Sequence, residues 1–154
     1  MRRLTMACLM CLLFSQFAAC GTSSNMSKYT QAQITALTTR TVDASYDDTF
    51  KAATDALFDG GYTVSQSDYA GGTVSGYKRD DKSAERFWIN PYIQDTDFRM
   101  SVLVRERSPV ETSVRLSMAI NGEPYIDEEA VDNFWQLMRR QVLIQAPPPV
   151  EAAE

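Results

Sequence analysis

A serine and a lysine in the middle of the chain have the spacing of a catalytic pair. Ser75 and Lys78 fit the pattern S-x-x-K, in which a lysine assists a serine nucleophile. That chemistry needs a helix, where residues three positions apart share one face. Here both residues fall in the segment 72–78, which predicts a strand and places them on opposite faces. We therefore expect no catalysis from this pair.

Two acidic pairs are further candidates for chemistry. Asp80 with Asp81, and Asp95 with Asp97, flank a segment that predicts a long loop. Clustered carboxylates there could bind calcium or exchange protons. Neither pair has the spacing of an EF-hand, and we interpret both as solvated loop charges.

The residue types that usually carry catalysis are missing from most of the chain. There is no histidine, and the three cysteines, Cys8, Cys11 and Cys20, all lie in the first twenty residues. Beyond that point the sequence lacks the commonest general base and any thiolate for a metal site or disulfide. We expect a protein that is not an enzyme, binds no metal and folds by packing.

The N-terminus has the composition of a secretory signal. Arg2 and Arg3 precede an apolar stretch over residues 4–14, which Ser15 and Gln16 interrupt. A membrane-spanning helix needs about 20 predominantly apolar residues, so this stretch is too short. The pattern disfavours a permanent transmembrane anchor.

The segment Phe17-Ala18-Ala19-Cys20 follows this stretch. Ordinary signal cleavage before Cys20 wants a small residue three positions before the cut, and Phe17 is large. The segment resembles a bacterial lipobox, with Phe17 in place of the usual leucine. This resemblance implies that residues 1–19 are removed and that Cys20 receives a diacylglycerol and an N-acyl chain. The alternative is that Cys20 is only an apolar residue of the signal.

Lipidation would decide where the protein resides. Two or more acyl chains hold a protein stably on a membrane, so we expect a lipid-anchored envelope protein with no cofactor besides that lipid. By resemblance to lipoproteins of enteric bacteria, Gly21 in place of aspartate favours the periplasmic face of the outer membrane over the inner membrane.

The bulk composition points to one globular domain without a nucleic-acid partner. A chain of 154 residues has room for a single hydrophobic core, and 44% hydrophobic residues suffice to build it. The net charge is -5, and without Arg2 and Arg3 the balance is 13 basic against 20 acidic residues. Binding to phosphate backbones needs a basic stripe, which this sequence lacks.

Composition also divides the chain. Residues 20–33 are rich in Ser, Thr and Gln and predict a flexible tether after the lipidated cysteine. Residues 146–154 carry three consecutive prolines and predict a disordered tail. The folded domain is therefore predicted over residues 34–145.

Within that domain the residue patterns predict five strands and two helices. Alternating or β-branched runs predict strands, and apolar residues at helical spacing after Ser45 and near Asp127 predict helices. The strands are expected at 34–44, 62–68, 72–78, 98–105 and 113–120, and the helices at 46–58 and 127–144. This order, β-α-β-β-β-β-α, predicts an α+β fold in which two helices cover one face of an antiparallel sheet of about four to five strands.

Two of these segments carry a family resemblance. FKAATDALFDGGYTVSQSDYAGGTVSGYK, residues 50–78, resembles small uncharacterised bacterial lipoproteins and, more loosely, the helix-grip domains of the barrel-assembly lipoprotein BamC. FWQLMRRQVLIQ, residues 134–145, is similar to the closing helix of such lipoproteins. The resemblance implies a fold and a location but no functional residue.

Four aromatic residues form a candidate partner surface. Phe87, Trp88 and Tyr92 lie in the apolar segment 86–94, and Trp135 lies beside the core position Phe134. Aromatic anchors are typical of protein interfaces. The alternative, which we favour for each of them, is packing against the sheet or in the core.

These observations leave three functions, in decreasing order. The first is a non-catalytic accessory or protein-interaction subunit anchored on the membrane. The second is binding of a lipid or apolar small molecule between the sheet and its helices. An enzyme is third, because no nucleophile is paired with a base. A cavity beside the C-terminal helix would favour the second function, and a filled core would favour the first.

Overall fold

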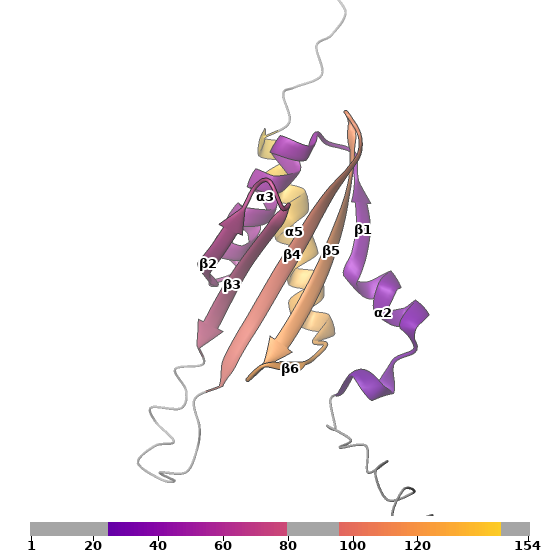
Figure 1. The fold of residues 1–154 in the computed structure, drawn as a ribbon, viewed down its shortest axis with the longest axis vertical. Coiled ribbons are helices and arrows are strands. Elements are labelled where there is room, and N and C mark those ends of the chain that lie inside the picture. The colour runs from indigo at the N-terminus through magenta and orange to yellow at the C-terminus, as the bar shows by residue number, and fades with distance from the viewer. Residues whose placement is uncertain (1–24, 80–95, 146–154) are drawn as a thin grey trace, which may run out of the picture.

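The computed structural model describes residues 25–79 and 96–145 (Figure 1). The lipidation site Cys20 and the aromatic residues Phe87, Trp88 and Tyr92 lie outside these ranges.

The described chain forms one antiparallel sheet. Its strands are β1 (Thr39–Val42), β2 (Thr63–Asp68), β3 (Thr73–Arg79), β4 (Asp97–Ser108), β5 (Glu111–Ile120) and β6 (Glu123–Pro124). The spatial order is β1-β5-β4-β3-β2, and β6 pairs with β5. β1 joins the far edge of the sheet beside β5, so the first and fifth strands of the chain become neighbours.

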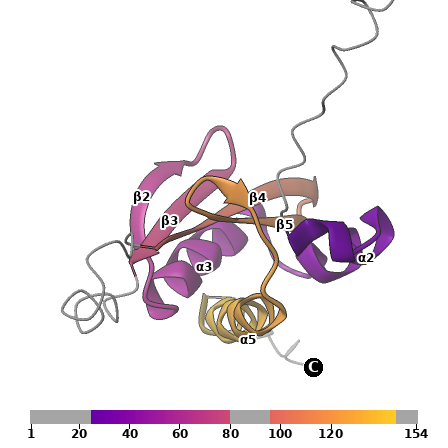
Figure 2. The same cartoon turned by 90° about the horizontal axis from the view of Figure 1, so that it is seen from below.

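Two long helices cover one face of this sheet. They are α3 (Tyr46–Asp59) and α5 (Glu128–Gln145), and both lie on the same side of the strands in Figure 2. A 3-10 turn η1 (Asn25–Lys28) and the short helix α2 (Gln31–Thr38) lie beside the sheet near β1. The predicted α+β fold with two helices on one face of an antiparallel sheet is confirmed.

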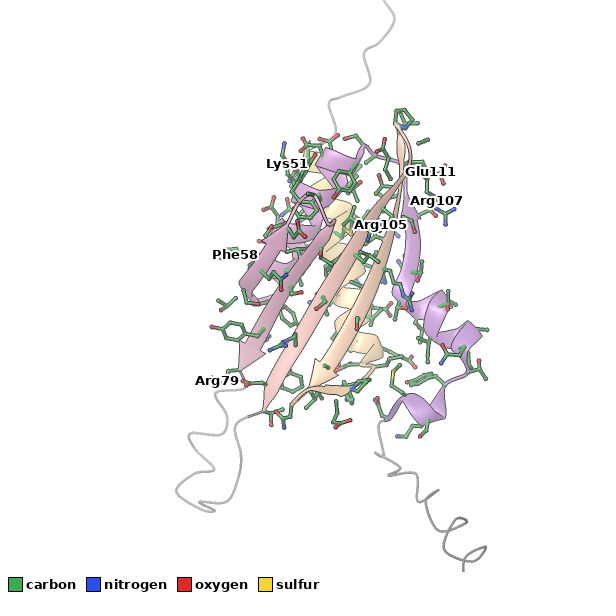
Figure 3. All side chains as sticks on the ribbon, viewed as in Figure 1. Lys51, Phe58, Arg79, Arg105, Arg107 and Glu111 are labelled. Carbon is green, nitrogen blue, oxygen red and sulfur yellow. The ribbon has the colours of Figure 1, made fainter. Side chains whose placement is uncertain are left out.

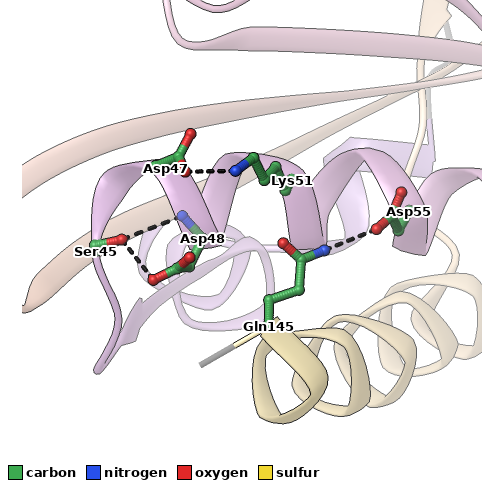
Figure 4. A network of polar contacts seen from close by, with 6 residues as sticks. All are labelled: Ser45, Asp47, Asp48, Lys51, Asp55 and Gln145. Atoms are coloured by element: carbon green, nitrogen blue, oxygen red, sulfur yellow. Dashed lines mark hydrogen bonds and ion pairs between the residues drawn. The ribbon is translucent and has the colours of Figure 1, made fainter. Parts of the chain in front are cut away.

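Local sequence signals set both ends of α3. The Ser45 hydroxyl accepts the backbone N–H of Asp48 at 3.2 Å and donates to the Asp48 carboxylate at 2.7 Å (Figure 4). At the other end Gly61 adopts a left-handed φ of 78°, and the N–H of Tyr62 reaches the carbonyl of Leu57 at 3.0 Å. This is the glycine cap that the sequence predicts after residue 59.

The core lies between the sheet and the helices α3 and α5. Alternate residues of the strands point inward, and the predicted inward side chains of β4 and β5 are buried. The helices contribute Leu57, Val131, Phe134 and Met138, each at most 3% exposed. The strands contribute Val74, Met100, Val102, Val104, Val114, Leu116 and Met118.

The predicted strand over residues 34–44 is wrong in its first half. Residues 34–38 belong to α2, and only Thr39–Val42 form a strand. The helix begins at Thr30, whose hydroxyl accepts the N–H of Gln33 while the Gln33 side chain accepts the N–H of Thr30. This capping box and the burial of Ile34 outweigh the β-preference of the threonines.

Part of the segment predicted as a tether is structured. The Asn25 side-chain amide donates to the carbonyl of Ile126 at 2.6 Å, and its oxygen accepts the N–H of Ile126 at 3.0 Å. The Tyr29 hydroxyl donates to the Glu128 carboxylate at 2.9 Å. These contacts join residues about one hundred positions apart, so the folded domain begins at Asn25 and not at residue 34.

Candidate functional site

The face of the sheet opposite α3 and α5 is covered by no described helix. Figure 1 looks onto this face, and Figure 2 shows both long helices on the other side. We call it the open face. Its side chains are set by register, because directly opposed residues on neighbouring strands project to the same side. Three of its cross-strand rows are Thr63–Tyr77–Arg99–Ala119, Gln66–Ser75–Ser101–Ser117 and Asp68–Thr73–Leu103–Arg115.

Tyr77 and Arg99 form the centre of the first row. Tyr77 on β3 lies directly opposite Arg99 on β4. Tyr77 is 39% exposed, and Arg99 is exposed and makes no ion pair with any residue that the structure describes. An aromatic ring and an unpaired guanidinium side by side are a combination typical of the centre of protein interfaces.

A serine row crosses the middle of the open face. The Ser75 hydroxyl donates to the Ser101 hydroxyl at 2.9 Å, and Ser117 follows on the next strand. Lys78 does not lie beside Ser75: its strand partner is Phe98, and it lines a hollow on the helix side. The sequence prediction that Ser75 and Lys78 lie on opposite faces is confirmed. The row can form hydrogen bonds with a ligand, but it contains no base that would activate a serine.

Arginines on β4 extend the positive character of this surface. Arg105 and Arg107 lie along the upper part of β4 in Figure 3. Arg105 donates to the carbonyl of Gly71 at 2.7 Å and so holds the turn between β2 and β3. Arg79 lies at the far end of β3, where it pairs with Asp97 at 3.5 Å. The helix layer carries the opposite character, because Asp47, Asp48, Asp55, Asp59, Asp127, Glu128, Glu129 and Asp132 lie on or next to α3 and α5.

Three hollows border the fold, and none of them enters the centre of the core. One of about 220 Å³ lies where the end of α3 meets the start of α5, and Lys78, Asp127 and Glu129 are among its lining residues. A second of about 280 Å³ lies between β1 and α5, beside Arg40 and Trp135. The third, of about 380 Å³, is a groove on the open face beside α2. Between the sheet and the two long helices the described core is filled, with Leu57, Val102 and Met138 at most 1% exposed.

Trp135 is a structural residue. Its side chain is only 4% exposed, and its indole N–H donates to the carbonyl of Leu37 at 3.1 Å. The Arg40 guanidinium lies 4.9 Å from the ring centre, a cation–π contact, and Arg40 also pairs with Asp132 at 3.8 Å. Trp135 therefore links α5 to α2 and β1, and its prediction as part of a partner surface is wrong because the ring is buried. The predicted alternative, packing in the core, is correct.

The titratable groups of the helix layer act in structural contacts. Hydrogen bonds from Gln141 and Arg140, both at 2.7 Å, hold the pKa of the Asp59 carboxyl below its ordinary value of 3.8. Asp47 beside Lys51 raises the pKa of that amine. Burial raises the pKa of the Tyr62 hydroxyl. Within residues 25–79 and 96–145, no three His, Cys, Asp or Glu side chains are grouped closely enough to hold a metal ion.

The open face is the surface that sequence reasoning did not single out. The alternation of β4 does place Arg99, Ser101 and Arg105 on one side, so the signal was available. Tyr77 was within a predicted strand, but its position opposite Arg99 depends on the register between two strands more than twenty residues apart. The predicted site residues Cys20, Phe87, Trp88 and Tyr92 lie outside the described residues.

Comparisons with known proteins leave the chain without a family assignment. No family model matches the sequence, and no curated protein matches it. Among solved structures, one similar chain is described as a DUF4468 family protein from Bacteroides ovatus ATCC 8483. It shares 15% sequence identity with a TM-score of 0.31, covering 70% of this chain and 77% of that one. A likeness at this level assigns neither a family nor an activity.

The helices of the structure give one further result. None of those within the described ranges has the length and apolar character needed to cross a bilayer.

Proposed function

We propose that the protein is a lipid-anchored bacterial envelope protein that acts without catalysis, as an accessory subunit that contacts a protein partner. The proposed anchor is the diacylglycerol and N-acyl chain on Cys20, and the favoured location is the periplasmic face of the outer membrane. The observation that carries the proposal of contact is the exposed Tyr77–Arg99 pair on a sheet face that no described helix covers.

The packing of the domain supports contact over enclosure of a ligand. The core between the sheet and the helices α3 and α5 is filled by side chains that are almost fully buried. A protein that encloses a small apolar ligand usually has a cavity of about 300–1,000 Å³ in such a place. The hollow nearest to this position has a volume of only about 220 Å³ and two carboxylates among its lining residues.

The open face has the composition that a contact surface needs. Interface centres are enriched in Tyr and Arg, and a few such residues supply most of the binding energy. Hydroxyl groups of Ser75 and Ser101 lie beside the pair and can satisfy polar groups of a partner. Because Arg99 has no ion pair with a described residue, a carboxylate of the partner could approach it without breaking an existing pair.

The anchor is tested by labelling cells with a fatty acid that carries a clickable group. The wild-type protein should take up the label and sediment with membranes. The Cys20→Ser variant should lose the label and either leave the membrane fraction or keep its signal. Unchanged labelling and unchanged membrane retention of Cys20→Ser would disprove the lipid anchor.

The contact is tested by affinity capture of the tagged full chain from detergent-solubilised membranes. Arg99→Glu and Arg139→Glu make the same charge change, and neither arginine has an ion pair among the described residues. Arg99 lies on the open face, whereas Arg139 lies on α5. We expect one stoichiometric protein to be recovered with wild type and Arg139→Glu but not with Arg99→Glu. Recovery of lipid without any protein would contradict the proposal.

A further inference from the structure

The groove on the open face has a mixed lining that the contact proposal does not use. It has a volume of about 380 Å³ and lies over β5, between the sheet and the segment η1–α2. The apolar part of its lining comes from Met26, Ile34, Leu103, Pro124, Tyr125 and Ile126. The polar part includes Ser101, Ser117 and one cation, Arg115.

Arg115 is the only charged residue in the lining of this groove. On β5 it lies directly between Leu103 of β4 and Thr39 of β1. Its guanidinium is exposed and makes no ion pair or hydrogen bond with a described residue. An unpaired cation at an apolar groove suits a ligand that has an apolar body and an anionic group.

The position of the groove in the chain indicates where such a ligand would come from. Met26, in its lining, is six residues after Cys20. A fully extended chain spans at most about 3.6 Å per residue, so the groove lies within roughly 20 Å of the proposed anchor. If Cys20 is acylated, the groove is held close to the headgroup layer of the bilayer.

We propose that this groove binds an anionic phospholipid of the membrane in which the protein is anchored. The phosphate pairs with Arg115, and the apolar part of the lipid lies against Met26, Ile34 and Leu103. This inference rests on the proposed lipid anchor and adds a second contact with the same membrane. An arginine near an anionic membrane surface contributes about 1 kcal/mol to binding, which corresponds to about a fivefold change in affinity.

The test uses the chain from residue 20 to 154 with Cys20→Ser, so that no anchor contributes. This chain contains every described element. Its binding is measured by flotation with vesicles of phosphatidylcholine alone and with vesicles that contain phosphatidylglycerol. We expect at least about fivefold stronger binding to the phosphatidylglycerol vesicles, and a decrease of that preference as salt screens the charge.

Three matched variants locate the binding. Arg115→Gln removes the charge in the groove, and it should abolish the preference for phosphatidylglycerol. Arg99→Gln removes a charge on the same face outside the groove lining, and Arg139→Gln removes one on α5. Both should retain the preference. Leu103→Ser tests the apolar part of the groove and should weaken binding to both kinds of vesicle, while circular dichroism checks that each variant is folded.

Two results would overturn the inference. Equal binding of wild type to both vesicle types would exclude recognition of the anionic group. Equal loss for Arg99→Gln and Arg115→Gln would show diffuse attraction to the whole face. The vesicle assay does not depend on Cys20, so failure of the acyl-labelling test with a retained preference would remove the anchor and leave the lipid site in place.

Discussion

Tyr77 and Arg99 lie directly opposite each other on β3 and β4, and both project from the sheet face that α3 and α5 leave uncovered. Neither side chain is needed by the core, because the inward positions beside them are Gly76 and Met100. The pair is therefore available for a function other than folding. This is the basis on which we assign contact with a partner to the open face.

The first prediction concerns Tyr77→Ala. Tyr77 is 39% exposed and has no printed role in the core, so the free energy of unfolding should change by less than about 1 kcal/mol. Loss of an aromatic anchor at an interface costs about 2 kcal/mol, which is roughly a thirtyfold weaker Kd for the captured partner. Titration of the purified pair measures this change. A Kd within about threefold of wild type would exclude Tyr77 from the contact.

The second prediction concerns Trp135→Phe. Phenylalanine keeps much of the buried ring but removes the indole N–H that reaches Leu37 and weakens the contact with Arg40. The unpaired carbonyl of Leu37 and the lost contact should lower the free energy of unfolding by about 1–3 kcal/mol. Urea unfolding followed by circular dichroism measures the loss. Unchanged stability together with weaker partner binding would return Trp135 to the contact surface.

The third prediction tests whether the core is filled. Met138 is 1% exposed, so Met138→Ala should lower the free energy of unfolding by about 2–5 kcal/mol. Leu143 lies on the same helix but is 74% exposed, so Leu143→Ala should change it by less than about 0.5 kcal/mol. Urea unfolding of both variants provides the comparison. Similar small effects at the two positions would indicate a loosely packed interior and would revive the enclosed-ligand hypothesis.

The fourth prediction concerns pH. The folded-state pKa of Asp59 is lowered from 3.8, because Gln141 and Arg140 donate hydrogen bonds to its carboxylate. The carboxylate therefore stabilises the fold above its unfolded-state pKa, and this contribution disappears as pH falls through the folded-state pKa. Near pH 6 the wild type should be more stable than Asp59→Asn, and the difference should shrink below pH 3.8. A difference that is constant over this range would show that the charge of Asp59 is not involved.

Much of the architecture could be predicted because the strongest signals are local. The alternation over residues 98–105 and 113–120 and the capping of α3 by Ser45 each depend on a few neighbouring residues. The first strand was misplaced because Thr35, Thr38 and Thr39 have the same β-preference, while only the last of them lies in β1. Burial of Ile34 and the bond from Trp135 to Leu37 come from distant parts of the chain, and no local pattern contains them.

The candidate site was harder to predict than the fold. A single strand shows which residues share a face, as Arg99 and Ser101 do not with Val102, but it does not show which face the helices will cover. The groove beside Arg115 depends on α2 and η1 lying next to β5, and the sequence pattern of residues 25–33 resembles a flexible tether. The contacts of Asn25 with Ile126 that place this segment span 101 positions.

The most direct measurement of the central claim is photo-crosslinking in intact cells from two matched positions. Gln66 lies on β2 in the row of Ser75 on the open face, and Gln136 is exposed on α5 in the helix layer. Each is replaced in turn by a photo-reactive amino acid in the full chain. We predict a protein adduct of one defined mass from position 66 and none from position 136. An adduct from position 136 alone, or identical adducts from both, would contradict a partner contact through the open face.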